Sequence, residues 1–229
     1  MWVLYGIGFA CALAVSLFLT PLVRKLALLI GAVDKPNERK VHTKLMPRLG
    51  GLAIYLGFIL GMFVVYPAIT GIDGKLIWGI VAGGSVVVLV GVLDDRFELS
   101  PKLKLLGQIA AALVVMSFGL DIEIVHLPFV EQAVELGWFS YPLTLFWIVG
   151  ITNAINLIDG LDGLASGVSG IATTAILGLA LMMGNVTVVL ICAVLLGAIV
   201  GFMYYNFYPA KIFMGDSGAL FLGFSLATL

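Results

Sequence analysis

Long, uninterrupted apolar stretches constrain the fold of this chain more than any other feature. We identify eight of them in the 229 residues, at positions 2–20, 49–66, 76–93, 103–120, 141–157, 164–183, 186–204 and 217–229. Most are close to the ~20 residues that an α-helix needs to cross a hydrocarbon core of ~30 Å. Because 62% of the residues are hydrophobic and only 11% are charged, a soluble domain could not cover its core with polar surface. The sequence therefore predicts an all-α, polytopic bundle of transmembrane helices.

The basic residues predict how the bundle is oriented in the membrane. Lys and Arg in short loops stay on the cytoplasmic side. Eleven of the twelve basic residues fall in the loops that follow the first, third and seventh stretches, and only Lys75 falls elsewhere. We therefore expect the N-terminus outside, with odd-numbered spans running inward.

The chain reads as one domain over residues 1–229, because no linker, low-complexity tract or repeat of fixed period interrupts it. Its last apolar stretch is the exception to the span lengths. Thirteen residues of helix cover about 20 Å, which is short of the ~30 Å core. A helix that ended inside the bilayer would leave its last carbonyl groups unsatisfied. We expect that the last span is incomplete and that the chain is a piece of a longer protein.

Three groups of carboxylates follow odd-numbered spans and are therefore predicted on the cytoplasmic side. They are Asp94 with Asp95, Asp159 with Asp162, and Asp216 in a Gly-Asp-Ser-Gly sequence. Acids at the ends of apolar helices are costly to desolvate, and carboxylate oxygens suit a hard divalent cation. Solvated helix ends, helix-packing contacts or a capped turn would each explain one group alone. The three together predict a site for a cation and phosphates.

Other polar residues strengthen this prediction. Asn153 and Asn156 lie one helical turn apart in an apolar span, and Asp159 continues the same face. The first loop carries Lys40, His42 and Arg48 and ends in two glycines. Such a segment suits a flexible clamp on phosphates, although a plain positively charged anchor explains its charge equally well.

Four segments resemble a known family in the same order along the chain. They are KVHTKLMPRLGG, GVLDDRFELSPKLKLLGQ, NAINLIDGLDGLASGV and NFYPAKIFMGDSGALFLGF. Together they resemble the bacterial polyprenyl-phosphate N-acetylhexosamine-1-phosphate transferases of glycosyltransferase family 4. The PRLGG and DDRFELS sequences are similar to the undecaprenyl-phosphate N-acetylglucosamine-1-phosphate transferases. They fit the muramoyl-pentapeptide branch less well, because that branch typically has Thr-Pro-Thr-Met-Gly-Gly in the first loop.

The resemblance implies a reaction. A UDP-N-acetylhexosamine, with UDP-GlcNAc preferred, would give its sugar 1-phosphate to undecaprenyl phosphate and release UMP. This would be the first membrane step of a cell-wall or surface polysaccharide such as teichoic acid. Mg²⁺ would be the cofactor, with Mn²⁺ as a substitute. The protein would lie in the bacterial cytoplasmic membrane with its site on the cytoplasmic face. No nucleic-acid partner is expected, and homodimer formation is left open.

By motif position, the resemblance also assigns roles to residues. Asn156 and Asp216 would be metal ligands. The catalytic residues would be Asp94, Asp95 and Asp159, with the first two nearest the attacking lipid phosphate. The substrate-binding residues would be Lys40, His42, Arg48, Lys102, Lys104, Asn153, Asp162, Asn206 and Phe213. Of these, Lys102 and Lys104 would hold phosphate oxygens, and Asn206 with Phe213 would form the uridine pocket.

Chemistry and sequence qualify these assignments. A phosphate monoester has a second pKa near ~6, so the lipid phosphate is largely dianionic at pH 7. We therefore expect Asp94 to position the lipid rather than deprotonate it, and direct displacement rather than a covalent aspartyl-phosphate.

The chain departs from the family in two ways. The family's further spans and His-rich loop are missing from this chain, and Ala219 stands where Ser is usual.

Three other functions remain open on the sequence. A cation-coupled transporter would place its acids near the bilayer midplane, whereas these acids fall at the ends of spans. An aspartate-rich prenyltransferase would need two similar acidic boxes, and the groups here are dissimilar. The third alternative is a non-catalytic fragment that acts only through packing.

Overall fold

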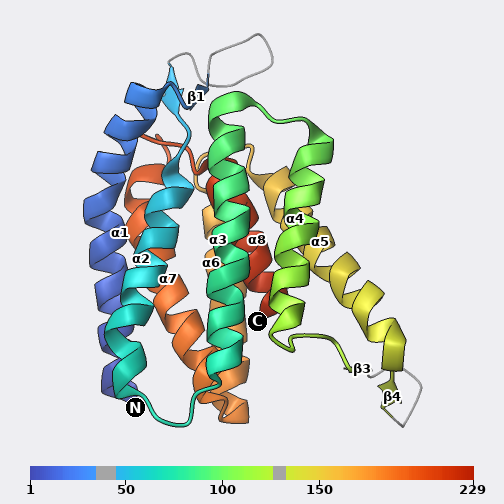
Figure 1. The fold of residues 1–229 in the computed structure, drawn as a ribbon. Coiled ribbons are helices and arrows are strands. Elements are labelled where there is room, and N and C mark those ends of the chain that lie inside the picture. The colour runs from blue at the N-terminus through green and yellow to red at the C-terminus, as the bar shows by residue number, and fades with distance from the viewer. Residues whose placement is uncertain (35–44, 126–132) are drawn as a thin grey trace.

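The computed structural model describes residues 1–34, 45–125 and 133–229, and in those residues it contains eight α-helices. They are α1 (Trp2–Ile30), α2 (Gly50–Val65), α3 (Gly74–Phe97), α4 (Pro101–Ser117), α5 (Ser140–Ile158), α6 (Leu164–Met183), α7 (Val186–Asn206) and α8 (Gly215–Thr228). A short 3₁₀ turn, η1 (Tyr66–Ala68), follows α2, and a second one, η2 (Gly137–Phe139), precedes α5. The helices run side by side as a bundle (Figure 1), which confirms the predicted all-α class.

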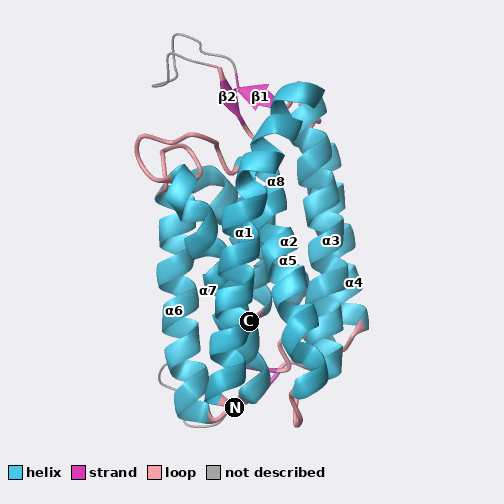
Figure 2. Ribbon diagram, turned by 90° about the vertical axis from the view of Figure 1, so that its left-hand side faces the viewer, coloured by secondary structure: helices cyan, strands magenta, loops and turns pink. Residues whose placement is uncertain are grey.

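Six of the described helices are long and apolar enough to cross a bilayer: α1, α2 with η1, α3, η2 with α5, α6 and α7. The two others, α4 and α8, have 17 and 14 residues. The short last helix agrees with the sequence, and the last residue lies inside the bundle, short of the end that holds the N-terminus (Figures 1 and 2). That the chain is a piece of a longer protein stays a prediction.

Two small antiparallel sheets mark opposite ends of the bundle. Strand β1 (Val33–Asp34) pairs with β2 (Met46–Pro47), and β3 (Ile124–Val125) pairs with β4 (Val134–Glu135). The connections from α3 to α4, from α5 to α6 and from α7 to α8 lie at the β1–β2 end (Figures 1 and 2). The three acidic groups are therefore at one end of the bundle, as the span parity predicted.

The first helix is longer than its predicted span. It continues through Pro21 to Ile30, so Arg24 and Lys25 lie on the helix and not in a loop. Proline removes one helical hydrogen bond but is tolerated in transmembrane helices. The apolar sequence after Pro21 continues to favour the helix, which ends at Gly31, a residue in the left-handed conformation.

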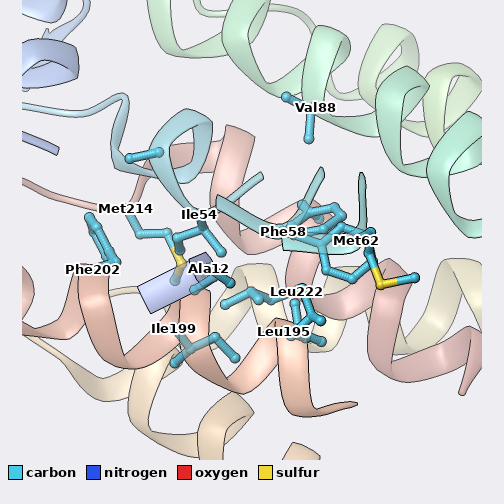
Figure 3. Packing of buried hydrophobic residues seen from close by; sticks show 14 of the residues in the cluster. Ala12, Ile54, Phe58, Met62, Val88, Leu195, Ile199, Phe202, Met214 and Leu222 are labelled. Atoms are coloured by element: carbon cyan, nitrogen blue, oxygen red, sulfur yellow. The ribbon is translucent and has the colours of Figure 1, made fainter. Parts of the chain in front are cut away.

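Helix α7 is the centre of the bundle's packing, between α1, α2 and α6. A Cβ at Gly197 or Gly201 would overlap a carbonyl oxygen of α1, so these glycines let the two backbones touch. The Gly-x-x-x-Gly spacing of this pair is typical of close contacts between transmembrane helices. Figure 3 shows side chains of α2, α7 and α8 interdigitating in the core, among them Phe58, Leu195 and Leu222.

Helix α8 lies inside the bundle, packed against α2, α3 and α5. Its residues from Ser217 to Ser225 are buried, and Leu220 and Phe221 have no exposed surface. The first turn of α8 therefore places Asp216 where α3 and α5 end and α4 begins.

Candidate active site

The start of α8 is held between α2 and α3 at distances that only glycine permits. A Cβ at Gly51 would overlap the backbone of Gly218, and a Cβ at Gly91 would overlap the backbone of Ser217. Gly215 turns the chain into the helix with a positive φ of 72°, which disfavours other residues. The first turn of α8 is thus fixed by backbone contact with two helices.

The end of the first loop is tied to the segment before α8. The Phe213 amide donates to the Pro47 carbonyl (2.8 Å), and the Phe213 carbonyl accepts from the Gly50 amide (3.0 Å). The Gly51 amide donates to the Met214 carbonyl (2.8 Å). These bonds place Arg48, which lies between Pro47 and Gly50, at the edge of the acidic group.

Lys104 joins two of the predicted acids. Its ammonium group donates to Asp94 Oδ2 (3.1 Å) and also to Asp216 Oδ2. Asn156 Nδ2 donates to the other oxygen of Asp216, Oδ1, at 2.6 Å. Two neighbouring carboxylates repel each other, and the ammonium group between them offsets this repulsion. Side chains from α3, α4, α5 and α8 therefore meet at one point.

Asp95 faces away from this point. Its side chain has 0% exposed surface. Its carboxylate accepts the backbone N–H groups of Asp216 (2.8 Å) and Ser217 (3.1 Å) and the Nε–H of Arg48 (3.3 Å). Burial alone would lower the pKa of Arg48, but the charges of Asp95 and Asp216 and the hydrogen bond to Asp95 raise it. The Arg48 guanidinium is therefore held charged among carboxylates, including Asp94 at 3.8 Å.

A cavity of about 410 Å³ opens beside these residues. Its charged lining consists of Arg48, Asp94, Glu98, Lys104 and Asp216, and its amide lining consists of Gln108, Asn153 and Asn156. Leu99, Pro101 and Leu105 supply an apolar wall. Deeper along α4 and α5, Gln108 Nε2 donates to Asn153 Oδ1 (3.2 Å) and Asn153 Nδ2 donates to Gln108 Oε1 (2.5 Å). The cavity thus combines both signs of charge with an apolar side.

Six of the predicted site residues line this cavity: Arg48, Asp94, Lys104, Asn153, Asn156 and Asp216. Lys40 and His42 lie outside the described residues. Lys102 is exposed on α4 and does not line the cavity. Phe213 is partly buried in the segment before α8. The roles assigned to all of these residues stay predictions.

Asp162 and Asn206 hold the chain in place. Asp162 Oδ2 accepts the Ala210 amide at 2.9 Å. Asn206 is buried, where its Oδ1 accepts from the Ser166 hydroxyl (2.8 Å) and its Nδ2 donates to the Ile212 carbonyl (3.1 Å). These bonds brace the connection from α7 to α8, and the predicted substrate contacts of both residues remain untested.

Asp159 lies just past the end of α5, where its amide donates to the Asn156 carbonyl (3.3 Å). Desolvation raises the pKa of Asp159 to about 7, and the charges of Asp216 and Asp95 act in the same direction. Arg48 opposes them. Asp159 thus belongs to the same electrostatic environment as the cluster, although it does not line the cavity.

Sequence reasoning missed Glu98 and Gln108. Gln108 carried a usable signal, because a polar side chain inside an apolar span often marks a functional site. Glu98 carried none, because its place in the lining depends on its left-handed backbone (φ 51°) at the end of α3.

The oxygen atoms at the site fit one kind of metal ion. Across the ranges that the structure describes, no three His, Cys, Asp or Glu residues surround one point. Mg²⁺ does not require such a group, because it keeps several waters and binds through one or two carboxylates plus substrate phosphates. The Asp216 carboxylate and the side-chain oxygen of Asn156 are oxygen donors of this kind.

Comparisons with known proteins identify the family. The sequence profile described as glycosyl transferase family 4 matches residues 77–229. A Bacillus subtilis protein named "probable undecaprenyl-phosphate N-acetylglucosaminyl 1-phosphate transferase" is 46% identical over 97% of this chain and 61% of its own length. A decaprenyl-phosphate N-acetylglucosaminephosphotransferase of Mycobacterium tuberculosis is 38% identical over 96% of this chain and 58% of its own.

A more distant relative comes from another branch. The phospho-N-acetylmuramoyl-pentapeptide-transferase of Listeria monocytogenes is 35% identical over 85% of this chain and 62% of its own length. The chain thus spans about three-fifths of the length of each of these relatives.

Proposed function

Because the chain belongs to glycosyl transferase family 4, we propose that it transfers N-acetylglucosamine 1-phosphate from UDP-GlcNAc to undecaprenyl phosphate and releases UMP. The observation that carries this proposal is the cavity at one end of the bundle, where Arg48 and Lys104 lie among Asp94, Asp216 and Asn156. Such a site offers cations for phosphate groups and oxygen ligands for a divalent ion.

The sugar and the lipid are proposed from the names of the relatives. The two that are 46% and 38% identical are named for N-acetylglucosamine phosphate and for undecaprenyl or decaprenyl phosphate. The muramoyl-pentapeptide relative is 35% identical. The Pro47-Arg48-Leu49-Gly50-Gly51 sequence supports the same choice, and it also positions Arg48 against Asp95.

The reaction is proposed as a direct displacement. An oxygen of the lipid phosphate forms a bond to the phosphorus that carries the sugar. The bond from this phosphorus to the oxygen shared with UMP breaks, and its electron pair leaves on UMP. No general base is needed, because the lipid phosphate is largely dianionic at pH 7. The main barrier is to bring two anions together in line, which the charges of Lys104 and Arg48 lower.

We propose Mg²⁺ as the cofactor, with Mn²⁺ as a substitute, held by Asp216 and Asn156. When bound, the ion supplies charge neutralisation at the diphosphate of the donor. Lys104 would supply a cation for a phosphate oxygen, and its bond to Asp94 would hold the ammonium group beside the cavity. Leu99 and Leu105 give the first isoprene units an apolar surface beside these charges.

The site is proposed to face the cytoplasm. The end of the bundle that holds the acids also holds the loops predicted inside from their basic residues. An enzyme reporter that is active only outside should work when fused after Pro67 and fail after Glu98. The reverse pattern would place the site on the wrong side for a nucleotide sugar. The position of the acids at one end also argues against a transporter, whose site would lie near the midplane.

The proposal is tested with the full encoded protein in detergent. Mg²⁺, undecaprenyl phosphate and UDP-GlcNAc together should release UMP, and EDTA should stop the release. Omission of the lipid should stop it as well, because no nucleophile is then in line with the diphosphate. Absence of UMP with every UDP-N-acetylhexosamine tried would overturn the transferase function.

A further inference from the structure

Asp94 and Asp95 are sequence neighbours with different surroundings. Asp94 lines the cavity and bonds to Lys104. Asp95 has 0% of its side chain exposed and does not line the cavity. Its oxygens accept three hydrogen bonds, two from the backbone of α8 and one from Arg48. The sequence treated the two acids as one catalytic pair, and the structure separates them.

We propose that Asp95 is a positioning residue and not a catalytic one. It fixes the first turn of α8 and thereby holds Asp216 where Lys104 and Asn156 reach it. The kinetic consequence of this inference rests on the proposed transferase function, whereas its structural part does not.

The hydrogen bonds explain how Asp95 could fix the helix. The first amides of an α-helix have no partner within the helix, and a carboxylate at this end is also favoured by the helix dipole. Asp95 supplies this carboxylate from another helix, to the amides of Asp216 and Ser217. A buried carboxylate needs compensation for its lost hydration, and the Arg48 guanidinium at 3.3 Å supplies it.

The packing leaves no space for a substrate at Asp95. A Cβ built at Gly215 would lie 2.6 Å from both carboxylate oxygens, and a Cβ at Gly91 would overlap Ser217. A phosphate is much larger than a methyl group, so it could reach Asp95 only after α8 had moved away. Since that movement would also remove Asp216 from Lys104, Asp95 cannot contact the substrate while the site is intact.

The structural part is tested by hydrogen exchange, read at single amides. First-turn amides of a helix normally exchange freely. In the wild type we expect the amides of Asp216 and Ser217 to be protected by at least ~100-fold. Asp95→Asn should reduce this protection ~10-fold or more, because one oxygen becomes an NH₂ group that cannot accept. Protection in the middle of α8 should not change. The matched control is Asp121→Asn at the other end of the bundle, which should leave both amides protected.

The kinetic part separates positioning from catalysis. Displacement of a reacting group by ~1 Å costs about 100-fold in rate. For Asp95→Asn we expect kcat to fall by about this factor, with KM for UDP-GlcNAc within ~3-fold of wild type. The pH profile of the remaining kcat should keep the wild-type shape. Gly91→Ala, which moves the start of α8 but keeps Asp95, should reproduce this pattern.

Each outcome decides a separate point. Free exchange of the two amides in the wild type would overturn the proposal without any variant, so it stays testable even if a variant does not fold. Loss of one limb of the pH profile in Asp95→Asn, with protection unchanged, would make Asp95 a catalytic acid or base and also overturn it. A wild-type protein without turnover would refute the transferase function, while the exchange experiment would still decide the role of Asp95.

Discussion

Asp73 and Asp95, at opposite ends of α3, both cap the start of a helix, but in different ways. Asp73 is exposed and accepts the amides of Lys75 (2.9 Å) and Leu76 (3.4 Å) in its own helix. Asp95 is buried and caps α8, more than a hundred residues away in the sequence. The first cap needs only local chain geometry, whereas the second needs three helices in place. The Asp73 cap is therefore local, whereas the Asp95 cap depends on the packing of α8 against α3.

The polar contacts at the two ends differ in how many partners each charged group has. At the β3–β4 end, the Ser140 hydroxyl donates to Asp121 (2.5 Å), the Ile122 amide donates to Thr144 Oγ1 (2.9 Å), and the Asp73 amide donates to Thr187 Oγ1 (2.7 Å). Each of these contacts joins one side chain to one other group. At the β1–β2 end, Arg48 and Lys104 each contact more than one carboxylate. A network in which charges share partners is expected to respond strongly to single substitutions.

The largest expected contrast is between two lysines. Lys104→Met removes the cation between Asp94 and Asp216 and a partner for the substrate phosphates, so we expect UMP release to fall by ~1,000-fold or more. Lys75→Met changes an exposed lysine at the β3–β4 end and should alter the rate by less than ~2-fold. Similar losses in the two variants would refute the functional difference between the ends.

A smaller effect is expected at the amide pair below the charged group. Gln108→Leu or Asn153→Leu alone removes the hydrogen bonds between the two side chains, which costs about 1 kcal/mol of unfolding free energy, because Asn153 is only partly buried and also donates to the Val149 carbonyl. The double variant should lose less than the sum of the two, because neither amide remains. The measurement is the free energy of unfolding in detergent for the two single variants and the double variant. Simple additivity would show that the pair does not act as a unit.

The local cap should matter for stability alone. Asp73→Ala removes the acceptor for the first amides of α3 and should cost about 1 kcal/mol of stability. The rate of UMP release at a temperature well below unfolding should stay within ~2-fold of wild type. A large loss of activity at unchanged stability would mean that the β3–β4 end of the bundle also takes part in function.

A pH-dependent effect on stability is expected at Asp159. Because its pKa is raised from 3.8 to about 7, the folded protein holds this proton more tightly than the unfolded chain does. The stability that wild type draws from Asp159 therefore falls as the pH rises from about 4 to about 7. Asp159→Asn should unfold at a higher temperature than wild type at about pH 8, and the gain should shrink near pH 4. The comparison is made in EDTA, and a gain that does not depend on pH would contradict it.

Several parts of this molecule could be predicted from the sequence. The length and hydropathy of the stretches predicted the helices, and span parity predicted that Asp94, Asp159 and Asp216 share one end. The spacing of Asn153 and Asn156 predicted that both face the same site, and both line the cavity. These predictions succeeded because they depend on local periodicity and on counting spans.

Other parts depend on how helices are rotated against each other. Asp95 turns from the cavity because Gly51 and Gly91 bring α8 into backbone contact with α2 and α3, and no local pattern shows which glycines meet. Asn206 is similar, since its side-chain amide is occupied by the nearby Ile212 carbonyl and by Ser166, forty residues away on α6. A residue's place in a sequence motif does not show whether its side chain braces the backbone, as at Asp95 and Asn206, or lines the cavity, as at Asp94.

The central claim is that phosphate transfer takes place at the start of α8. The direct measurement uses UDP-GlcNAc labelled with radioactive phosphorus at the phosphate that carries the sugar, together with undecaprenyl phosphate and Mg²⁺. Wild type and Asp121→Asn should transfer the label to the lipid at similar rates. Asp216→Asn, monodisperse and folded in the same detergent, should transfer at least ~1,000-fold less, because Lys104 and Asn156 lose their shared carboxylate. Transfer by Asp216→Asn within ~10-fold of wild type would contradict the account and place the chemistry elsewhere.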